Sequence, residues 1–359
     1  MEKRLKRTLG VALMVMMVAA GTLAGLPGVP MPSAAATGAN TNPALVVAYS
    51  ANVENLIGHT ANPAVCQRAY TRLADYMAAQ PLAPDFVLIQ QVSDQANLDK
   101  FISALSARTG RPYAGFIAVS PRPMGTGNCR TGTGQNAGET DLISDQKKYQ
   151  TNAIIYRTGR FHLVGSKHTW KSDAQKVAGG TCSNAADFDS SQDRTINVAG
   201  RFYDDKAAKH VTVASFHWPS GNVGSGNNEA CAQENVSELV DHTSDATMGL
   251  SALQISGGDA NVLGVDAAGT WQPWYTAAHN LGLRDAVRER CAAMGLSNVD
   301  CEATNWTSPN KVKRIDYLFA GSSTGTGNGA TIPYEAVGPV TTVSDQYSDH
   351  RAVQGYFYY

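Results

Sequence analysis

Residues 253–261 read Leu-Gln-Ile-Ser-Gly-Gly-Asp-Ala-Asn, a stretch that joins an apolar run to two polar side chains. The run Leu253–Ser256 is typical of a buried β-strand, and Asp259 and Asn261 follow at its end. Because Asp and Asn also favour turns, either residue taken alone could be structural. The same arrangement recurs along the chain, and this recurrence is what predicts the fold.

Further apolar runs typical of buried strands occur at 45–49, 86–89, 153–156, 211–216, 315–319 and 353–357. Helical patterns lie between the first of these runs, at 66–79 and 93–107, whereas the middle of the chain has strand following strand across short polar turns. This order predicts a protein of mixed α and antiparallel β structure, whose sheets are covered by helices.

Polar and ionisable residues stand at the ends of these runs. They are Asn52, Gln90, Gln91, His217, Asp259, Asn261, Asp316 and the triplet Ser348-Asp349-His350. Strand ends in α/β proteins face a common rim, so residues distant in sequence can converge there. Carboxylates and carboxamides are hard ligands for Mg²⁺ or Ca²⁺, and histidines add phosphate-binding or proton-transfer groups. The inventory favours metal-assisted hydrolysis of a phosphate ester. No H-E-x-x-H zinc motif occurs, and the G-x-S-x-G match at Gly321–Gly325 (GSSTG) stands in a short glycine-rich stretch that we expect to be a loop, not a nucleophile elbow.

The first 36 residues are typical of a secretory signal peptide. Basic residues at positions 3, 4, 6 and 7 precede an apolar run over 11–26, and Ser33-Ala34-Ala35-Ala36 follows. A transmembrane anchor is the alternative, but the run is short and interrupted by glycines. We therefore expect a secreted, extracellular protein without stable membrane anchoring, with a short linker over 37–43 and one domain over 44–359.

The composition agrees with a folded domain, because 43% of the residues are hydrophobic and 16% are charged. Without residues 1–36 the net charge is 25 minus 29, or −4, so capture of nucleic acid by the whole surface is not implied. Six cysteines in an exported chain predict three disulfides. Fifteen connectivities are possible, and the sequence favours only one pair, Cys291–Cys301, because these two cysteines would close a short loop.

The polar strand ends, taken in chain order, resemble the endonuclease/exonuclease/phosphatase superfamily, which includes deoxyribonuclease I-like nucleases, sphingomyelinases and inositol-polyphosphate phosphatases. The matching segments are Val47–Val53, Pro84–Val92 (PDFVLIQQV), Asn152–Arg157 (NAIIYR), Ser215–His217, Gly258–Asn261 (GDAN), Arg314–Tyr317 (RIDY) and Ser348–His350 (SDH). The resemblance covers the chain from about residue 44 to the end. It implies a four-layer α/β sandwich of two packed mixed β-sheets flanked by helices, with the site at one rim.

The resemblance also implies a divalent metal, Mg²⁺ or else Ca²⁺ or Mn²⁺, held by Asn52, Gln91 and Asp349. The family has a metal-binding Glu where this chain has Gln91, so metal affinity should fall. A second family Glu aligns, less securely, with Gln150. Three outcomes stay open: a weaker or differently selective metal enzyme, a displaced carboxylate such as Glu54 that supplies the charge, or an inactive protein kept for binding.

Carried over in the same way, Asp259 would orient or deprotonate the attacking water. His217 and His350 would stabilise the charge that develops on the phosphate, and Asp316 would fix the tautomer of His350. A buried ion pair with Arg314 is the alternative role for Asp316.

Four further residues are expected at the substrate. Asn261 would hydrogen-bond a phosphate oxygen, and Asn152, Arg157 and Trp218 would contact the rest of the substrate. Residues 120–146 are expected to flank the cleft.

Nucleic acid is the favoured substrate of a monomeric secreted nuclease. A phospholipid or sphingomyelin phosphodiesterase, a phosphatase, and a binding protein without catalysis remain as alternatives.

Overall fold

The computed structural model describes residues 38–53, 70–120, 150–172, 175–176, 182–183, 193–219, 227–244, 248–308, 313–321, 326–331, 347–348 and 350–359. The expected signal peptide lies outside these residues. Residues 34–359 form one unit, which starts before the expected boundary at residue 44. Among the described helices, none is long and apolar enough to cross a membrane.

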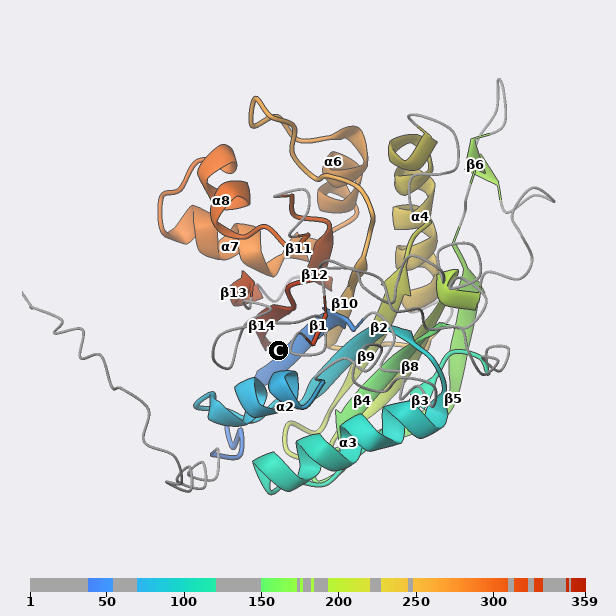
Figure 1. Ribbon diagram of the computed structural model, residues 1–359, viewed down its shortest axis with the longest axis vertical. Coiled ribbons are helices and arrows are strands. Elements are labelled where there is room, and N and C mark those ends of the chain that lie inside the picture. The colour runs from blue at the N-terminus through green and yellow to red at the C-terminus, as the bar shows by residue number, and fades with distance from the viewer. Residues whose placement is uncertain are drawn as a thin grey trace, which may run out of the picture. The chain divides into compact units, whose positions relative to one another are not determined.

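Two six-stranded mixed sheets form the centre of the protein (Figure 1). The first has the order β13-β14-β1-β2-β4-β3 and consists of β1 (Leu45–Asn52), β2 (Phe86–Val92), β3 (Tyr113–Ile117), β4 (Thr151–Arg157), β13 (Thr326–Thr331) and β14 (Val353–Tyr358). The second has the order β11-β12-β10-β9-β8-β5 and consists of β5 (Phe161–Lys171), β8 (Ile196–Asp204), β9 (Lys209–His217), β10 (Leu253–Asp259), β11 (Arg284–Asp285) and β12 (Asp316–Gly321). A short hairpin of β6 (Gln175–Lys176) and β7 (Cys182–Ser183) stands apart.

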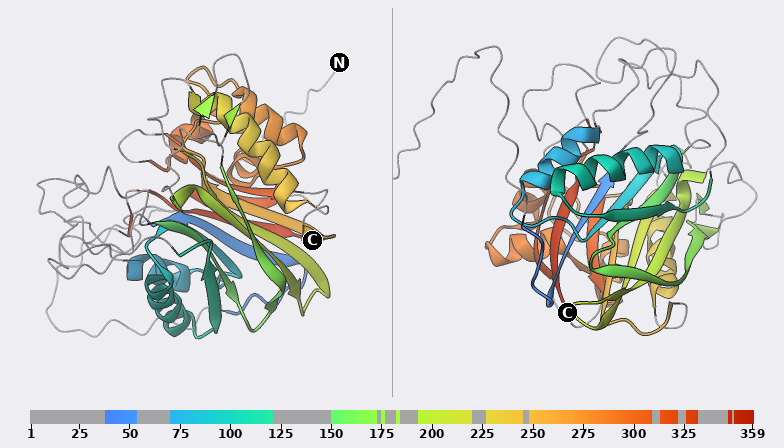
Figure 2. Two further views of the ribbon diagram at one scale, coloured as in Figure 1. Left: turned by 90° about the vertical axis from the view of Figure 1, so that its right-hand side faces the viewer. Right: turned by 90° about the horizontal axis from the view of Figure 1, so that it is seen from below.

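Helices cover the outer faces of both sheets (Figure 2). The first sheet is covered by α2 (Tyr70–Ala79) and α3 (Gln95–Thr109). The second is covered by α4 (Asn227–Thr243) and α6 (Pro273–Asn280). The short helices α7 (Ala286–Ala293) and α8 (Asn298–Thr304) follow β11. The predicted four-layer α/β sandwich is therefore confirmed.

The continuous apolar runs exist because both faces of the central strands are buried. Along β1, Val46 and Ala48 pack between the sheets, whereas Val47 and Tyr49 pack against α2 and α3. Helix α3 meets this face with Leu98, Phe101 and Leu105, which recur at helical spacing. Since every such strand is apolar on both sides, polar side chains are left to the strand ends.

The short turn between β4 and β5 does not make a β-hairpin. Strand β4 pairs with β2 and β3, whereas β5 pairs with β8 in the other sheet. The chain crosses from one sheet to the other at this turn, so the two strands close one end of the sandwich.

That closed end is held by buried ion pairs. Asp85, just before β2, pairs with Arg157 at 2.6 Å and with Arg160 at 3.2 Å, and Arg160 also binds Asp204. All four side chains are at most 4% exposed. The hydroxyl of the last residue, Tyr359, donates to Asp204 at 2.9 Å. This network joins both sheets and the C-terminus.

Residues 38–43, expected as a linker, belong to the fold. Asn40 is fully buried, and its amide donates to Asp85 at 2.7 Å and to the carbonyl of Leu45 at 2.6 Å. Gly38 forms a β-bridge with Leu82. Residues 38–43 thus contact the domain through the buried, hydrogen-bonded amide of Asn40, while the boundary between linker and domain stays a prediction.

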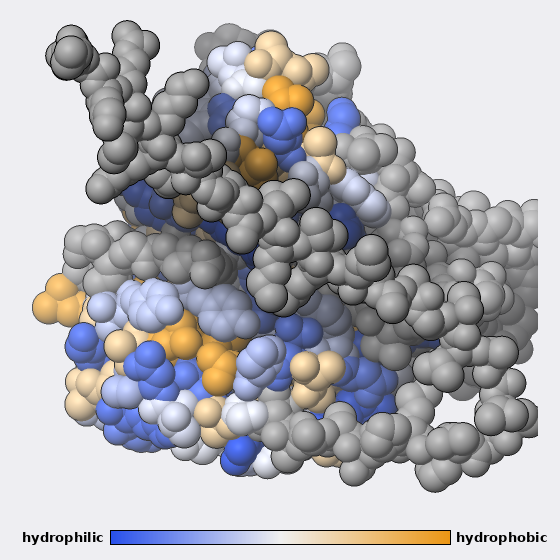
Figure 3. Space-filling view, turned by 90° about the vertical axis from the view of Figure 1, so that its left-hand side faces the viewer, coloured by the Kyte–Doolittle hydropathy of each residue, from blue (hydrophilic) through white to orange (hydrophobic). Residues whose placement is uncertain are grey.

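The surface shown in Figure 3 is mostly hydrophilic where it is coloured, with hydrophobic residues in small separate groups. The large hydrophobic side chains that are exposed among the described residues are Leu250, Leu281, Met294, Val299 and Tyr358. Single exposed apolar residues of this kind are normal on soluble domains.

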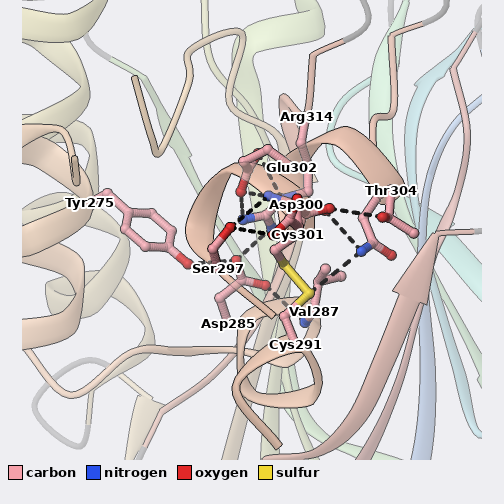
Figure 4. The surroundings of a disulfide bond; sticks show 11 residues. Tyr275, Asp285, Val287, Cys291, Ser297, Asp300, Cys301, Glu302, Thr304 and Arg314 are labelled. Atoms are coloured by element: carbon pink, nitrogen blue, oxygen red, sulfur yellow. Dashed lines mark hydrogen bonds and ion pairs between the residues drawn. A yellow bond between two sulfur atoms is a disulfide. The ribbon is translucent and has the colours of Figure 1, made fainter. Parts of the chain in front are cut away.

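The predicted disulfide between Cys291 and Cys301 is present and joins α7 to α8 (Figure 4). Cys231 is also disulfide-bonded, and none of the described cysteines is free. The pairing of the remaining cysteines stays a prediction.

The closed-end network gives a prediction about stability. Replacing Asp85 by Ala (Asp85→Ala) leaves two buried guanidinium groups with less compensation, so we expect a loss of about 3–5 kcal/mol of unfolding free energy in urea denaturation. Asp75→Ala is the matched control, because Asp75 pairs with Arg108 in a partly exposed position and should cost less than about 1 kcal/mol. Equal small losses in both variants would contradict this role for Asp85.

Candidate active site

The open end of the sandwich gathers polar side chains from both sheets. In the second sheet, Asp259 at the end of β10 pairs in register with His217 on β9 and with Asp316 on β12. In the first sheet, β1 ends at Asn52. His350 precedes β14, which also belongs to the first sheet. Residues almost 300 positions apart in the sequence therefore share one rim.

Asp259 is at the centre of this cluster. Its Oδ2 accepts a hydrogen bond from Asn52 Nδ2 at 3.0 Å. The same oxygen lies 3.7 Å from His217 Nε2 and 3.8 Å from His350 Nε2. Its second oxygen, Oδ1, accepts from the backbone N–H of Asn261 at 2.8 Å. One carboxylate thus connects the two sheets and faces both histidines.

The orientation of His350 is fixed by Asp316, whose Oδ2 lies 2.8 Å from His350 Nδ1. A carboxylate beside Nδ1 holds the proton on that nitrogen, so Nε2 faces Asp259. Asp316 does not pair with Arg314. That guanidinium binds Asp285 and Glu302 instead.

Two positioning residues gave no distinctive sequence signal. Thr307 Oγ1 accepts from the backbone N–H of Asp316 at 3.0 Å, which holds the start of β12. Asn197 Oδ1 accepts from the backbone N–H of His217 at 2.8 Å. Both residues are polar and fully buried, and their positioning role can be recognised only from this burial in the structure.

Backbone geometry at the rim is unusual at two positions. Gln91 has φ 63° and Asn261 has φ 55°, both in the left-handed region that few non-glycine residues adopt. Gln91 lies in an irregularity of the β2–β4 pairing, between Ile89 and Val92. Strained residues of this kind cluster at functional sites, where the surrounding structure holds them.

The glycines before Asp259 allow the close approach that the site requires. A Cβ on Gly257 would lie 2.8 Å from Ser50 Cβ in the facing sheet. A Cβ on Gly258 would lie 1.9 Å from the carbonyl oxygen of Phe216. Any larger residue would push β10 away from its neighbours and displace Asp259.

Gln91, the residue that departs from the family pattern, is 6% exposed and accepts a hydrogen bond from Gln150 Nε2 at 3.3 Å. The two positions where the family would have carboxylates therefore form a neutral amide pair. In the parallel pairing of β1 with β2, Asn52 lies opposite Gln90. Gln91 is the next residue of β2 after Gln90. Asp349 and Glu54 lie outside the described residues, as do residues 121–149 of the expected cleft loop.

The structure does not bring Arg157 to the rim, and this corrects the expectation that Arg157 contacts the substrate. β4 runs antiparallel to β2, so its last residue lies at the closed end, where Arg157 is ion-paired with Asp85. Asn152, at the other end of β4, is fully buried and donates to the carbonyls of Arg194 and Ile196. These contacts give Asn152 a structural role.

Trp218 is also placed differently from the expectation. Its side chain is 2% exposed and packs against Phe216 and Trp274, so the ring belongs to the core. Its carbonyl accepts from Asn261 Nδ2 at 2.8 Å. Trp218 thus positions Asn261 through its backbone and has no face for a substrate.

A divalent cation would find suitable donors here. Oxygen or nitrogen atoms of Asp259, Asp316 and His350 lie within 4.8 Å of one another. The amide of Asn52 contacts Asp259, and carboxylate and amide oxygens are the ligands that Mg²⁺ and Ca²⁺ prefer. The residues present therefore fit such an ion.

Burial, together with the neighbouring charge of Asp316, raises the pKa of Asp259 to about 6, while His350 opposes the shift. A carboxylate with this pKa is a suitable general base near neutral pH.

No protein-family model matches the sequence, and no curated protein matches it. Solved structures match the fold. An endonuclease/exonuclease/phosphatase from Bacteroides vulgatus has a TM-score of 0.52 at 14% identity, over 87% of this chain and 98% of that chain. A mannosyl-6-phosphatase from Bacteroides thetaiotaomicron has a TM-score of 0.52 at 17% identity, over 88% and 100%. D. rerio TDP2, complexed with a single-strand DNA product, has a TM-score of 0.51 at 16% identity, over 88% and 99%.

The chain therefore has the deoxyribonuclease I-like fold found in endonuclease/exonuclease/phosphatase structures, as the sequence resemblance predicted. At these identities the likeness establishes the fold and leaves the activity to be argued from the site.

The raised pKa of Asp259 predicts a trade-off between stability and function. An acid with a raised folded pKa binds its proton more tightly when folded, so its contribution to stability falls as the pH rises from its usual 3.8 to about 6. With divalent cations removed, we expect Asp259→Asn to have a higher melting temperature than the unaltered protein at pH 7 to 8. The difference should disappear below about pH 4, and calorimetry across this range would measure it. A lower melting temperature of the variant at every pH would contradict the argument.

Proposed function

We propose that this chain is a secreted phosphoric ester hydrolase that requires a divalent cation and cleaves the phosphodiester bonds of nucleic acids. The observation that carries the proposal is the convergence of polar side chains from both sheets at one rim. Asp259 Oδ2 is in contact with Asn52 and lies within 4 Å of two histidines, one of which is oriented by Asp316.

Each residue has a role in the proposed reaction. Asp259 accepts a proton from the water that attacks phosphorus, and the bond from phosphorus to the leaving oxygen breaks. His350 and His217 direct their Nε2 atoms toward the same region and stabilise the charge that develops on the phosphate oxygens. Asn261, held by the Trp218 carbonyl, supplies a further polar group at the rim.

The divalent cation, when bound, would polarise the phosphate and stabilise its developing charge. Its donors would come from Asn52, Gln91 and Asp349, and the carboxylates of Asp259 and Asp316 would add negative charge beside it. We propose Mg²⁺ as the ion, with Ca²⁺ or Mn²⁺ as substitutes, because the donors are hard oxygen atoms.

The neutral pair of Gln91 and Gln150 favours a second candidate function, a binding protein without catalysis on the same fold. Such a pair brings no negative charge to a cation, and a lost charge next to a metal weakens its binding. The raised pKa of Asp259 favours the enzyme over the binding protein. A buried carboxylate with a raised pKa lowers the stability of the folded protein, and catalysis would give a reason for keeping it.

Secretion, a monomeric state and nucleic acid as the substrate are parts of the proposal that rest on the sequence. The export signal is inferred from residues 1–36. The sequence shows neither a basic stripe for nucleic acid nor an exposed amphipathic helix for lipid, so the preference for nucleic acid over phospholipid rests on the resemblance to nucleases and not on a surface feature. The known structures of this fold include both a phosphatase and a protein with a DNA product, so the substrate must be measured.

Turnover of defined substrates tests the function. We expect the chain from residue 37 onward to cleave plasmid DNA or RNA in Mg²⁺, Ca²⁺ or Mn²⁺ and to lose this activity with a chelator. Sphingomyelin, inositol phosphates and a phosphomonoester serve as alternative substrates in the same assay. His217→Ala or His350→Ala should lower kcat by several powers of ten with little change in melting temperature.

His162→Ala is the matched control, because His162 is 57% exposed on β5 and should leave kcat unchanged. Turnover of a different ester alone would reassign the substrate. If no ester is cleaved with any cation, the binding protein becomes the better description.

The Gln91 position gives a separate prediction about the cation. Gln91→Glu adds a negative charge at a position proposed to bind the cation. We expect Mg²⁺ to bind roughly 10-fold to 100-fold more tightly, which is the usual size of the effect when a residue at a metal site is changed. Calorimetric titration would measure the affinity without reference to activity. Gln95→Glu is the control, since Gln95 lies at the start of α3 and hydrogen-bonds Asp99. Equal affinities in the two variants would show that Gln91 is not a ligand position.

A further inference from the structure

A second cavity, with a volume of about 260 Å³, lies away from the rim among α6, α7 and α8. Its walls include the aromatic and apolar side chains Trp271, Tyr275, Leu283 and Phe319. Phe319 is three residues along β12 from Asp316 and pairs with Asp285 of β11, at the edge of the second sheet. Three strand residues span about 10 Å, so this cavity is distinct from the candidate active site.

Arg288 lines the cavity and is only 9% exposed. Its Nη1 and Nη2 atoms are buried, and neither has a hydrogen-bond partner in the structure. Among the described residues, it also makes no ion pair. Most buried polar groups are satisfied, so a buried guanidinium with two unpartnered nitrogen atoms requires a physical reason.

The acidic residues nearest in the sequence do not neutralise Arg288. Asp285 accepts from Tyr275 and from the backbone of Val287, and it is ion-paired with Arg314, as Figure 4 shows for this neighbourhood. Glu302 is ion-paired with the same residue, Arg314. Asp285 and Glu302 are therefore committed to another arginine, and Glu289, which follows Arg288 in the sequence and also lines the cavity, forms no ion pair with Arg288 in the structure.

A buried charge without a counter-ion lowers stability, and an oxyanion would remove that cost. The planar fork of a guanidinium matches the two oxygen atoms of a carboxylate or phosphate. The flat wall of Trp271 and the apolar side chains of Leu283 and Phe319 suit an apolar or aromatic body. The lining therefore combines an anion-binding group with apolar and aromatic side chains, which is the pattern of a small-molecule site.

We propose that this cavity binds a small organic monoanion, with its carboxylate or phosphate group on Arg288 and a flat apolar body against Trp271. The volume equals that of roughly nine water molecules, which sets the size of the ligand. Glu289 also lines the cavity, so a ligand with more than one negative charge is disfavoured. Because Nη1 and Nη2 are covered in this structure, binding includes a small shift of the Arg288 side chain or its neighbours.

The test uses benzoate, phenyl phosphate and the neutral benzamide as probes, with thermal melting and calorimetric titration as measurements. We expect benzoate to raise the melting temperature by a few degrees at saturation, as a ligand that binds only the folded state must, and benzamide to have no effect. Phenyl phosphate is mostly a dianion at pH 7, so it should bind more weakly than benzoate, and binding of phenyl phosphate alone would contradict the proposed monoanion. Binding should persist in His350→Ala, which separates this cavity from the rim.

Variants of Arg288 distinguish a ligand site from a structural residue. Arg288→Met should abolish benzoate binding and should melt at a higher temperature than the unaltered protein without ligand, because it removes an uncompensated buried charge. Arg288→Lys keeps the charge without the fork and should bind at least about 10-fold more weakly. Arg290→Met is the matched control, because Arg290 is exposed on the same helix.

The proposal is overturned if neither anion shifts the melting temperature. It is also overturned if both anions bind equally well to the protein with Arg288 and to Arg288→Lys.

Discussion

The burial of both faces of both sheets is the constraint from which the rest of this structure follows. Strands such as β1 pack toward the other sheet with Val46 and Ala48 and toward the helices with Val47 and Tyr49. A strand that is apolar on both sides can place charged groups only at its ends. Each end of the sandwich carries a cluster of buried charged groups, and the two clusters differ in how the charges are matched. At the closed end each carboxylate meets an arginine, whereas at the open end two carboxylates and two histidines stand together.

This difference explains why one end is structural and the other is suited to chemistry. Around Asp85 and Asp204 each carboxylate is ion-paired with an arginine at short distance, so these groups are already neutralised and do not attract a charged ligand. At the rim, burial and the like charge of Asp316 raise the pKa of Asp259. The rim is electrostatically unfavourable in the protein alone, and a divalent cation would relieve it. The buried guanidinium of Arg288 is likewise electrostatically unfavourable without a partner, but its charge is positive, so an anion would relieve it.

The errors made from the sequence have specific causes. Arg157 was expected at the substrate as part of the segment Asn152–Arg157 that matches the family. β4 is antiparallel to β2, however, so the end of β4 lies at the closed end of the sandwich. Trp218 was expected at the cleft because it follows His217, but the pleat directs its ring to the helix-covered face. Strand direction and side-chain alternation depend on which strands pair, and the sequence around each residue does not carry that information.

The sequence by itself determined the apolar strands, the local Cys291–Cys301 disulfide and the ordered set of polar strand ends from which the fold was predicted. These features are local, since they depend on hydrophobic pattern, short loop closure and residue type. Only the tertiary structure decided that Asp316 faces His350 instead of Arg314, that Gln91 pairs with Gln150, and that Arg288 is left without a partner beside a cavity. Each of these is a contact between distant segments, and its energy depends on burial and on the full set of neighbouring charges.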